Sequence, residues 1–382
     1  MPLRYLTAGE SHGKALVGIL EGLPSGLELS ASDIQSELAR RKRGHGRGNR
    51  QKIETDAVEI LSGVRHGKTL ASPIALLIAN ADFKNWESIM AVAPVAGPVS
   101  RRVEVPRPGH ADLVGALKYG FDDMRNVLER SSARETAMRV ALGSAARKFL
   151  RACGVSIASR VVEIGAVADV GPWNGPASKL NQAADLSPVR CTNAAAEKRM
   201  IAAIDQAKAE GDTLGGIFEV YAEGLPVGLG SYAQWDRRLE APIAAAVMSL
   251  NAIKGVEIGL GFQAARVPGS LAHDEYVPKK KHVGYKSNRS GGIDGGMTTG
   301  QAVIVRAAMK PLATLMKPLA SVNLKTGAAA RAHIERSDVC AVPAAAVIAE
   351  SLLALVLADA VLAKFGGDSM QELLPRLKSW KP

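Results

Sequence analysis

The sequence predicts a single domain of the α+β class, and three observations support this. Short runs rich in valine and isoleucine alternate with helical stretches along the chain. Their spacing is too irregular for the repeated strand–helix–strand units of a doubly wound parallel sheet. No low-complexity linker divides the 382 residues, of which 47% are hydrophobic, so the chain can bury one sizeable core. We therefore expect one domain over residues 1–382, ending in a C-terminal tail at 366–382.

The expected elements follow from these runs and from their end signals. The expected strands are Arg4–Ala8, Ala15–Glu21, Val58–Ser62, Ile74–Ala79, Val155–Ile164, Ile217–Ala222 and Ala302–Ala307. The expected helices are Asp33–Arg43, Ala133–Ala152, Asn193–Ala209, Ala241–Lys254 and Ala344–Phe365. Ser32 with Gln35, and Ser132 with Glu135, have the spacing of capping boxes at the first two helices. Proline, glycine and serine between residues 165 and 190 predict a long surface connection.

The most apolar segment, Ala341–Phe365, is expected to be a buried helix. Its uninterrupted apolar stretch, Leu352–Ala358, is far shorter than the roughly 18–20 residues that span a bilayer. The N-terminus lacks the pattern of a secretory signal. The three cysteines have neither metal-ligand nor redox-pair spacing, which is typical of a reducing compartment. We therefore expect a cytoplasmic protein with no membrane segment and no metal site.

Most of the excess positive charge lies in one segment. The chain has 48 basic and 37 acidic side chains, a formal net charge of +11. Seven basic residues with no acid among them fall between positions 40 and 52: Arg40, Arg41, Lys42, Arg43, Arg47, Arg50 and Lys52. Gly44, Gly46 and Gly48 allow the backbone to bring Arg47 and Arg50 toward one point, and guanidinium groups match phosphate and carboxylate. We expect a small polyanionic ligand here, with a solvated cationic face as the alternative.

A further alternative is that this basic segment binds nucleic acid. Such a surface needs extended positive charge and, for single strands, aromatic side chains on which bases stack. The segment contains no phenylalanine, tyrosine or tryptophan, and the other 41 basic side chains of the chain exceed its 37 acidic ones by only four. The sequence therefore favours a small-molecule anion and predicts no nucleic-acid partner.

Other residues have the chemistry of anion binding and proton transfer. Arg130–Glu135 opens a helix with two arginines and two serines, and the free N–H groups of a helix N-terminus bind phosphate. His12 and His110 lie in glycine-containing turns, and imidazole exchanges protons near neutral pH. Asp338 adds a carboxylate between basic neighbours. Together these residues predict an enzyme with at least two anion sites and a phosphorylated ligand.

Short matches to other enzyme motifs are weaker. Gly9–Gly13 fits the G-x-S-x-G elbow of hydrolases, but only one strand precedes it and no oxyanion segment is found. Ser11–Lys14 and Lys325–Gly327 fit two motifs of penicillin-recognising enzymes, whose middle S-D-N element is missing. Gly9–Lys14 is one residue short of a Walker A loop. Matches this short arise by chance, so none of them defines the function.

Longer blocks of sequence resemble one known family. They are Thr7–Gly13, Arg40–Arg50, Arg107–Asp112, Glu129–Thr136, Gly211–Gly216, Asn251–Gly259, Gly291–Gly296, Lys310–Thr314 and Arg336–Asp338. In these blocks, which run in order over nearly the whole chain, the sequence closely resembles the chorismate synthases. The resemblance implies helices sandwiched between two antiparallel β-sheets, and assembly as a homotetramer.

The resemblance also implies a reaction and a cofactor. Chorismate synthases eliminate phosphate from 5-enolpyruvylshikimate 3-phosphate in an anti-1,4 sense, which gives chorismate on the shikimate pathway to aromatic amino acids. They require reduced FMN although the reaction has no net redox change. The flavin would be reduced either by NADPH on this chain or by a separate flavin reductase.

By the same resemblance, four residues have catalytic roles. His12, with Ser11 beside it, would protonate or orient the departing phosphate. His110 would hold a proton near flavin N1 and so stabilise the anionic reduced flavin. Asp338 would take a proton from flavin N5, which helps the flavin to accept the proton lost from the substrate ring.

The binding residues are assigned in the same way. The arginines expected to bind the substrate or NADP are Arg41, Arg47, Arg50, Arg107 and Arg134. The residues expected to contact FMN are Arg130, Ser131, Ser132, Asn251, Ala252, Gly295, Lys310, Pro311, Leu312, Ala313, Thr314 and Arg336. Two positions depart from the family pattern: His45 stands where tyrosine is common, and Asp294 where an uncharged residue is usual. A carboxylate near a flavin phosphate is unfavourable, so we expect Asp294 to point away.

Overall fold

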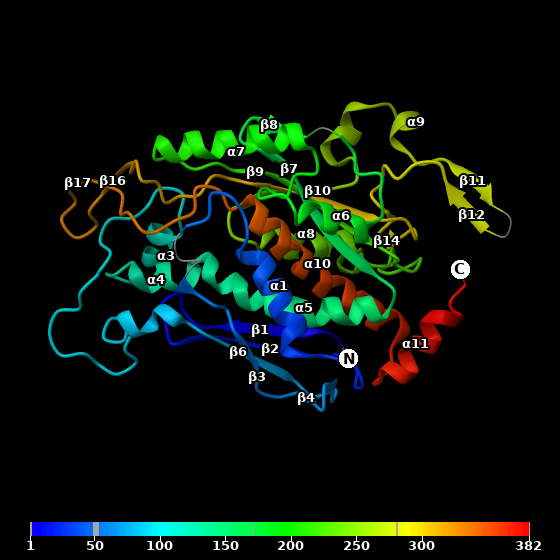
Figure 1. The fold of residues 1–382 in the computed structure, drawn as a ribbon, viewed down its shortest axis with the longest axis horizontal. Coiled ribbons are helices and arrows are strands. Elements are labelled where there is room, and N and C mark those ends of the chain that lie inside the picture. The colour runs from blue at the N-terminus through cyan, green and yellow to red at the C-terminus, as the bar shows by residue number, and fades with distance from the viewer. Residues whose placement is uncertain (1, 49–52, 170, 280–281, 382) are drawn as a thin grey trace.

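Two antiparallel sheets enclose a layer of helices (Figure 1). The computed structural model describes residues 2–48, 53–169, 171–279 and 282–381. The first sheet has the order β1-β2-β6-β3, with β1 Arg4–Ala8, β2 Ala15–Glu21, β6 Ile74–Ala79 and β3 Val58–Ile60. The second has the order β10-β15-β9-β7-β8, with β10 Ile253–Ile258, β15 Val303–Met309, β9 Gly216–Glu223, β7 Ser156–Ile164 and β8 Val167–Ala168. The expected α+β sandwich is confirmed.

Three helices form the central layer: α1 Ala31–Lys42, α5 Thr136–Ala152 and α10 Val342–Phe365. α10 packs against α5, β7 and β9, and α5 also contacts β2 and β6, so these helices join the two sheets. By length and composition α10 could cross a membrane, but 83% of its most apolar window is buried inside the protein. At Gly143 of α5 an added Cβ would lie 2.5 Å from the Cβ of Ser351, so glycine allows α5 and α10 to approach closely.

Smaller elements surround this core. The other helices are α3 Asp112–Tyr119, α4 Arg125–Ser131, α6 Ala177–Ala184, α7 Ala194–Ala209, α8 Glu240–Met248, α9 Gly269–Ala272 and α11 Met370–Ser379. Short 3₁₀ turns span Ala81–Asn85, Ala133–Glu135, Trp235–Arg237 and Gly261–Arg266. The remaining strands pair as hairpins: β4 Val64–Arg65 with β5 Lys68–Thr69, β11 Tyr276–Lys279 with β12 His282–Tyr285, β13 Ile293–Asp294 with β14 Met297–Thr298, and β16 Ala320–Val322 with β17 Ala329–Arg331.

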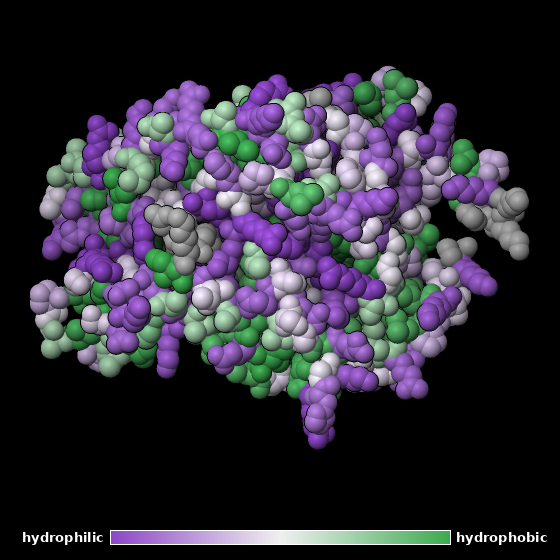
Figure 2. Space-filling view, viewed as in Figure 1, coloured by the Kyte–Doolittle hydropathy of each residue, from purple (hydrophilic) through white to green (hydrophobic). Residues whose placement is uncertain are grey.

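The four-stranded sheet buries one face and leaves apolar groups on the other. In β2, Leu16 and Leu20 point into the core, whereas the alternate residue Ile19 is 42% exposed. Leu6 of β1 lies directly opposite Ile19 and is 69% exposed. Figure 2 shows hydrophobic groups gathered along the lower edge of the molecule, in the region of this sheet. We call this exposed side of β1 and β2, which carries Leu6 and Ile19, the outer apolar face.

Several element boundaries differ from expectation. The first helix is capped by Ser30 in a box with Asp33, not by Ser32 with Gln35. Ser132 accepts from the Arg134 N–H and caps a 3₁₀ turn, so its predicted box with Glu135 was wrong.

Three further segments contain a helix or strand that was not predicted. The helix predicted over 241–254 ends at Met248, because Ala252 takes a left-handed φ of 67° and reverses the chain into β10. The predicted surface connection at 165–190 contains β8 and α6, and the C-terminal segment 366–382 contains α11.

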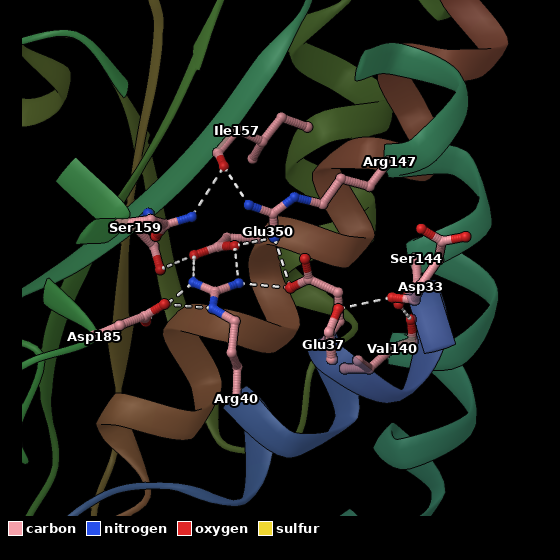
Figure 3. Close-up of polar contacts among 12 residues, drawn as sticks. Asp33, Glu37, Arg40, Val140, Ser144, Arg147, Ile157, Ser159, Asp185 and Glu350 are labelled. Carbon is pink, nitrogen blue, oxygen red and sulfur yellow. Dashed lines mark hydrogen bonds and ion pairs between the residues drawn. The ribbon is translucent and has the colours of Figure 1, made fainter. Parts of the chain in front are cut away.

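A network of buried charges crosses the helical layer (Figure 3). Glu350 of α10 is fully buried and accepts from Arg40 of α1 at 2.8 and 3.0 Å, and also from Arg147 of α5. Ser159 of β7 donates to the same carboxylate at 2.6 Å. Arg190, Glu37 and Asp185 complete the network. The basic segment therefore begins with a side chain that neutralises a buried acid rather than a ligand.

Candidate active site

A cavity of about 410 Å³ opens where the helical layer meets several loops. It is bounded by the C-terminal end of α1, the loop after it, the junction of α4 and α5, and the N-terminal turns of α10. Segments 107–111, 250–252, 309–314 and 335–338 close its sides. Seven of the nine sequence blocks, although far apart along the chain, therefore contribute to one cavity, whereas Gly211–Gly216 and Gly291–Gly296 do not line it.

Buried arginines form part of the cavity wall. Arg41 donates to the Thr136 hydroxyl at 2.9 Å and to the Ala133 carbonyl at 3.0 Å. Burial lowers the pKa of Arg41 to about 10, so the guanidinium keeps its charge at neutral pH. Arg134 pairs with Asp56 and donates to Asn80 at 3.0 Å. These partners hold both cations rigidly beside the cavity.

The loop after α1 is held by Asp338. Arg47 donates to one oxygen of Asp338 at 2.6 Å, and the Gly48 N–H donates to the other at 2.6 Å. A Cβ at Gly48 would lie 2.8 Å from the Ser337 carbonyl oxygen, so only glycine permits this approach. Arg47 faces the cavity, and its Nε has no hydrogen-bond partner within the described residues. Arg47 therefore lies in the wall of a concave site.

His12 lies in a buried setting of its own. Its Nδ1 is 2.9 Å from Oε1 of Glu129, and its backbone N–H donates to Oε2 of Glu129 at 2.8 Å. Its ring stacks on Trp86 with 3.9 Å between centroids and 17° between planes. A proton on Nδ1 donates to the carboxylate, so Nε2 is left for the cavity, which His12 lines.

His110 forms a second pair with a carboxylate. Its Nδ1 is 2.6 Å from Asp112 Oδ1, and Arg107 donates to both oxygens of Asp112. Burial alone would raise the pKa of Asp112, but hydrogen bonds from His110 and Arg107 hold it well below its usual value. Arg107 also donates to the Thr314 hydroxyl at 2.8 Å. One buried carboxylate thus orients both a histidine and an arginine of the cavity wall.

Two polar residues extend the wall on the side of β10 and β15. Lys310 donates to the Gly109 carbonyl at 2.9 Å, and burial together with the nearby Lys254 lowers its pKa. Asn251 donates to the Ser131 carbonyl at 3.0 Å, while its buried Oδ1 has no partner among the residues described. Both side chains retain capacity to bind a ligand.

Most of the expected site residues lie together. Those that line the cavity are Ser11, His12, Arg41, Arg47, Arg107, His110, Ser131, Ser132, Arg134, Asn251, Ala252, Lys310, Leu312, Ala313, Thr314, Arg336 and Asp338. Arg336 is also bonded to Asp82 at 2.7 Å. Arg50 lies outside the described residues, and Pro311 belongs to a lining segment without lining the cavity itself.

Besides Pro311, two further expected FMN contacts do not line this cavity. Arg130 instead donates to the carbonyls of Thr7 and Gly9, at 3.0 and 3.1 Å, and so covers the edge of β1. Gly295 is exposed in the turn between β13 and β14, and Asp294 beside it is exposed as well. Asp294 therefore does not line the cavity.

Sequence reasoning missed the residues that orient the two histidines. Glu129 and Asp112 both lie in the sequence blocks described above, but the sequence assigned neither of them a role. Trp86 lies in none of those blocks. Its stacking on His12 joins residues far apart in the chain, and nothing in the local sequence indicates it.

The fold and this cavity define a class of protein. Several fixed guanidiniums select a small, multiply charged anion, and two histidines with carboxylate partners supply acid–base groups. The protein is therefore an enzyme that moves protons on an anionic substrate.

Comparison with known proteins identifies the family. The family model described as chorismate synthase matches residues 3–362. A relative named chorismate synthase 2 from Bacillus cereus is 54% identical over 97% of this chain and 96% of its own. Chorismate synthase from Chlorobaculum tepidum is 53% identical over 99% and 98%. A solved structure titled "Crystal Structure of Chorismate Synthase" matches with a TM-score of 0.79 and 42% identity, covering 99% of this chain and 97% of that one.

The chain belongs to the chorismate synthase family. It is a lyase of the shikimate pathway that removes phosphate from 5-enolpyruvylshikimate 3-phosphate to give chorismate.

Proposed function

We propose that the cavity binds 5-enolpyruvylshikimate 3-phosphate and reduced FMN together. The observation that carries this is the convergence of Arg41, Arg47, Arg107 and Arg134 on one cavity. The substrate has one phosphate and two carboxylates, and FMN adds another phosphate. Fixed guanidiniums match these groups in charge and geometry.

The residues present fit a flavin beside the substrate. The buried Nε of Arg47 and the buried Oδ1 of Asn251 have no partners within the described residues, so each can bond a ligand. Residues proposed to hold FMN are Ser131, Ser132, Asn251, Ala252, Lys310, Thr314 and Arg336. The chemistry that reduced FMN supplies when bound is acceptance of the ring proton of the substrate, with no net redox change.

Each acid–base residue has a proposed task. His12, with Ser11 beside it, protonates the departing phosphate through Nε2, because Glu129 occupies Nδ1. His110 holds a proton at the edge of the flavin ring, oriented by Asp112. Asp338 is proposed to accept a proton on a lone pair that its oxygens retain beside the hydrogen bonds from Arg47 and the Gly48 N–H.

A homotetramer is proposed for the assembly. The outer apolar face, with Leu6 and Ile19 exposed, is suited to burial against a second copy. Gly295, which does not line the cavity of its own chain, is proposed to contact the flavin bound by another copy. We further propose a cytoplasmic location, one domain that includes α11, and reduction of the flavin by NADPH or by a separate reductase.

An anaerobic assay tests the proposed cofactor. We expect chorismate to form when enzyme and substrate are supplied with chemically reduced FMN. A parallel assay with oxidised FMN and NADPH tests whether this chain reduces its own flavin. Absence of chorismate with reduced FMN would refute the flavin requirement as proposed.

Substitution of the histidines tests their roles. H12A and H110A should each reduce turnover by about 100-fold or more, the usual scale for general acid–base groups. H66N serves as the matched control, because His66 is exposed in the turn between β4 and β5 and its φ of 51° is tolerated by asparagine. Near-native turnover in H12A and H110A would contradict the assignment.

A further inference from the structure

His12 is held on two sides by side chains that do not line the cavity. Glu129 is 2% exposed and contacts both the backbone N–H and the Nδ1 of His12. Trp86 is 5% exposed and lies flat against the imidazole ring. Within the described residues, Nδ1 is the only ring nitrogen of His12 with a hydrogen-bond partner. The ring therefore has one fixed orientation, with Nε2 as its working nitrogen.

The charges around this ring come from several elements. Arg125 of α4 donates to Glu129 at 3.1 Å and to Glu335 at 3.0 Å, and His333 is bonded to Glu335. The guanidiniums of Arg101 and Arg125 lie 4.3 and 5.1 Å from the centre of the Trp86 ring. Asp82 is hydrogen-bonded to Trp86 and pairs with Arg336 of the cavity wall. The other cations of that wall are Arg41, Arg47, Arg107, Arg134 and Lys310, among the residues that the structure describes.

These surroundings keep Glu129 ionised. Burial alone would raise the pKa of Glu129, but the hydrogen bonds from His12 and Arg125 outweigh it and hold that pKa below its usual value. The charge of Arg125 is in turn divided between Glu129 and Glu335. The nearest full charge to the imidazole is therefore negative.

We propose that Glu129 and Trp86 are positioning residues for His12. The carboxylate fixes a proton on Nδ1, and the face of the indole ring fixes the plane of the imidazole, so Nε2 is held toward the cavity. His12 is thereby prepared to give a proton from Nε2 to the departing phosphate rather than to take one. This inference rests on the acid role of His12 under the proposed function.

The other histidine of the cavity has a different setting. His110 also has a carboxylate partner, but Nη2 of Arg107 lies 3.0 Å from its Nδ1 and no aromatic ring stacks on it in the described structure. A guanidinium therefore lies in direct contact with the ring of His110. Two histidines with similar sequence settings are thus given different chemistry by their neighbours.

Kinetics of E129Q test the proposal. Glutamine keeps the shape and can still accept from Nδ1, but it removes the negative charge. We expect kcat to fall about 10- to 100-fold while KM changes by less than about threefold. The alkaline limb of the pH–rate profile should move to lower pH, because the imidazolium loses its counter-charge. A profile parallel to the wild type, or a raised KM with unchanged kcat, would overturn the proposal.

E219Q provides the matched control. Glu219 of β9 is 4% exposed and accepts from Arg160 and Arg306, so the same change removes a buried, arginine-paired carboxylate away from the cavity. The kinetics of E219Q measure how much turnover and its pH dependence change when any buried, arginine-paired carboxylate loses its charge. A shift of the pH profile in E219Q equal to that in E129Q would count against a specific role for Glu129.

Replacement of Trp86 gives a second test that leaves the buried charges in place. W86F keeps an aromatic face against His12 and should retain most of the turnover. W86L removes that face, so it should lose most of the turnover and shift the alkaline limb of the pH–rate profile in the same direction as E129Q. Equal turnover of W86F and W86L would refute the part assigned to the indole ring.

A readout without cofactor or turnover separates this proposal from the proposed function. In the ¹⁵N NMR spectrum of the histidine-labelled, flavin-free enzyme, with His12 assigned by H12N, we expect the proton on Nδ1 at neutral pH. A His12 ring protonated only at Nε2 would overturn the positioning by Glu129. Near-native turnover in H12A would instead overturn the acid role itself.

Discussion

Replacing Glu350 with glutamine should destabilise the fold severely. The carboxylate is fully buried and accepts from Arg40, Arg147 and the hydroxyl of Ser159. The network contains three buried guanidiniums and three carboxylates, so E350Q leaves three positive charges facing two negative ones. Breaking a buried ion pair by removing one partner costs about 3–5 kcal/mol, because the remaining charge is left uncompensated.

This cost is large beside the stability of a typical protein. Native domains are stable by about 5–15 kcal/mol, so E350Q would remove about a fifth or more of the usual margin. A change of 1 kcal/mol lowers the melting temperature of a larger domain by about 2–4 °C, so we expect a decrease on the order of 10 °C.

The difference in stability between wild type and E350Q should also depend on pH. Burial alone would raise the pKa of Glu350, but the charges of Arg40 and Arg147 outweigh it and hold the pKa in the folded state well below its usual value. A carboxyl group whose pKa is lowered by folding stabilises the protein fully above its unfolded pKa of about 4.3, and this contribution is lost as the pH falls. The gap between wild type and E350Q should therefore narrow as the pH falls below about 4.3.

Thermal unfolding followed by circular dichroism at about pH 7, 5 and 3 measures both effects. S351A is the matched control, because the buried Ser351 hydroxyl on the same helix has no partner in the part of the chain described. It should change stability by less than about 1 kcal/mol. Equal melting temperatures of E350Q and S351A would contradict this role of Glu350. So would a difference in melting temperature between wild type and E350Q that stays constant as the pH falls.

Three further substitutions test the packing of the cavity wall, the packing of the core and the binding of an anion by Arg47. G48A should reduce kcat/KM by about 10- to 100-fold with little change in melting temperature, because its Cβ would push the loop away from the Ser337 carbonyl oxygen; unchanged steady-state kinetics would contradict this. G143A should lower the free energy of unfolding by about 1–3 kcal/mol in urea denaturation, because α5 and α10 would be overpacked; wild-type stability would show that the helices can separate freely. D338N should strengthen inhibition by inorganic phosphate, because Arg47 loses its counter-charge; an unchanged inhibition constant would show that Arg47 does not bind the anion.

The parts of the fold that depend on local sequence were predicted closely. β1, β2 and β6 have the predicted bounds, because alternating apolar residues lie between glycine and polar turns. The helix after 241 was overextended because its alanine-rich composition continues past Met248, and β10 exists only through pairing with β15. α6 was missed because proline and glycine precede it, while the packing of Leu180 against Ala158 and Tyr221 is non-local.

The cavity was predicted through its residue types, but the partners of those residues were not. Arginines, histidines and an aspartate mark anion binding and proton transfer wherever they stand in the sequence. Asp338 and Arg47 are 291 residues apart, and His12 and Glu129 are 117 apart, so neither pairing leaves a spacing to detect. Such contacts depend on how the two sheets and three helices are stacked, which a single sequence does not determine.

The basic segment shows why a cluster in sequence is not a cluster in space. Successive residues of a helix point about 100° apart, so Arg40 and Arg41 at the end of α1 must face different surroundings. Arg40 enters the buried network, whereas Arg41 enters the cavity wall. Convergence on the ligand begins only where the helix ends and the chain turns through Gly44 and Gly46, both at positive φ, to bring Arg47 to the cavity. The net charge of the segment therefore overstates its anion-binding power, because part of it neutralises acids in the core, and the turn after the helix decides how much remains for the substrate.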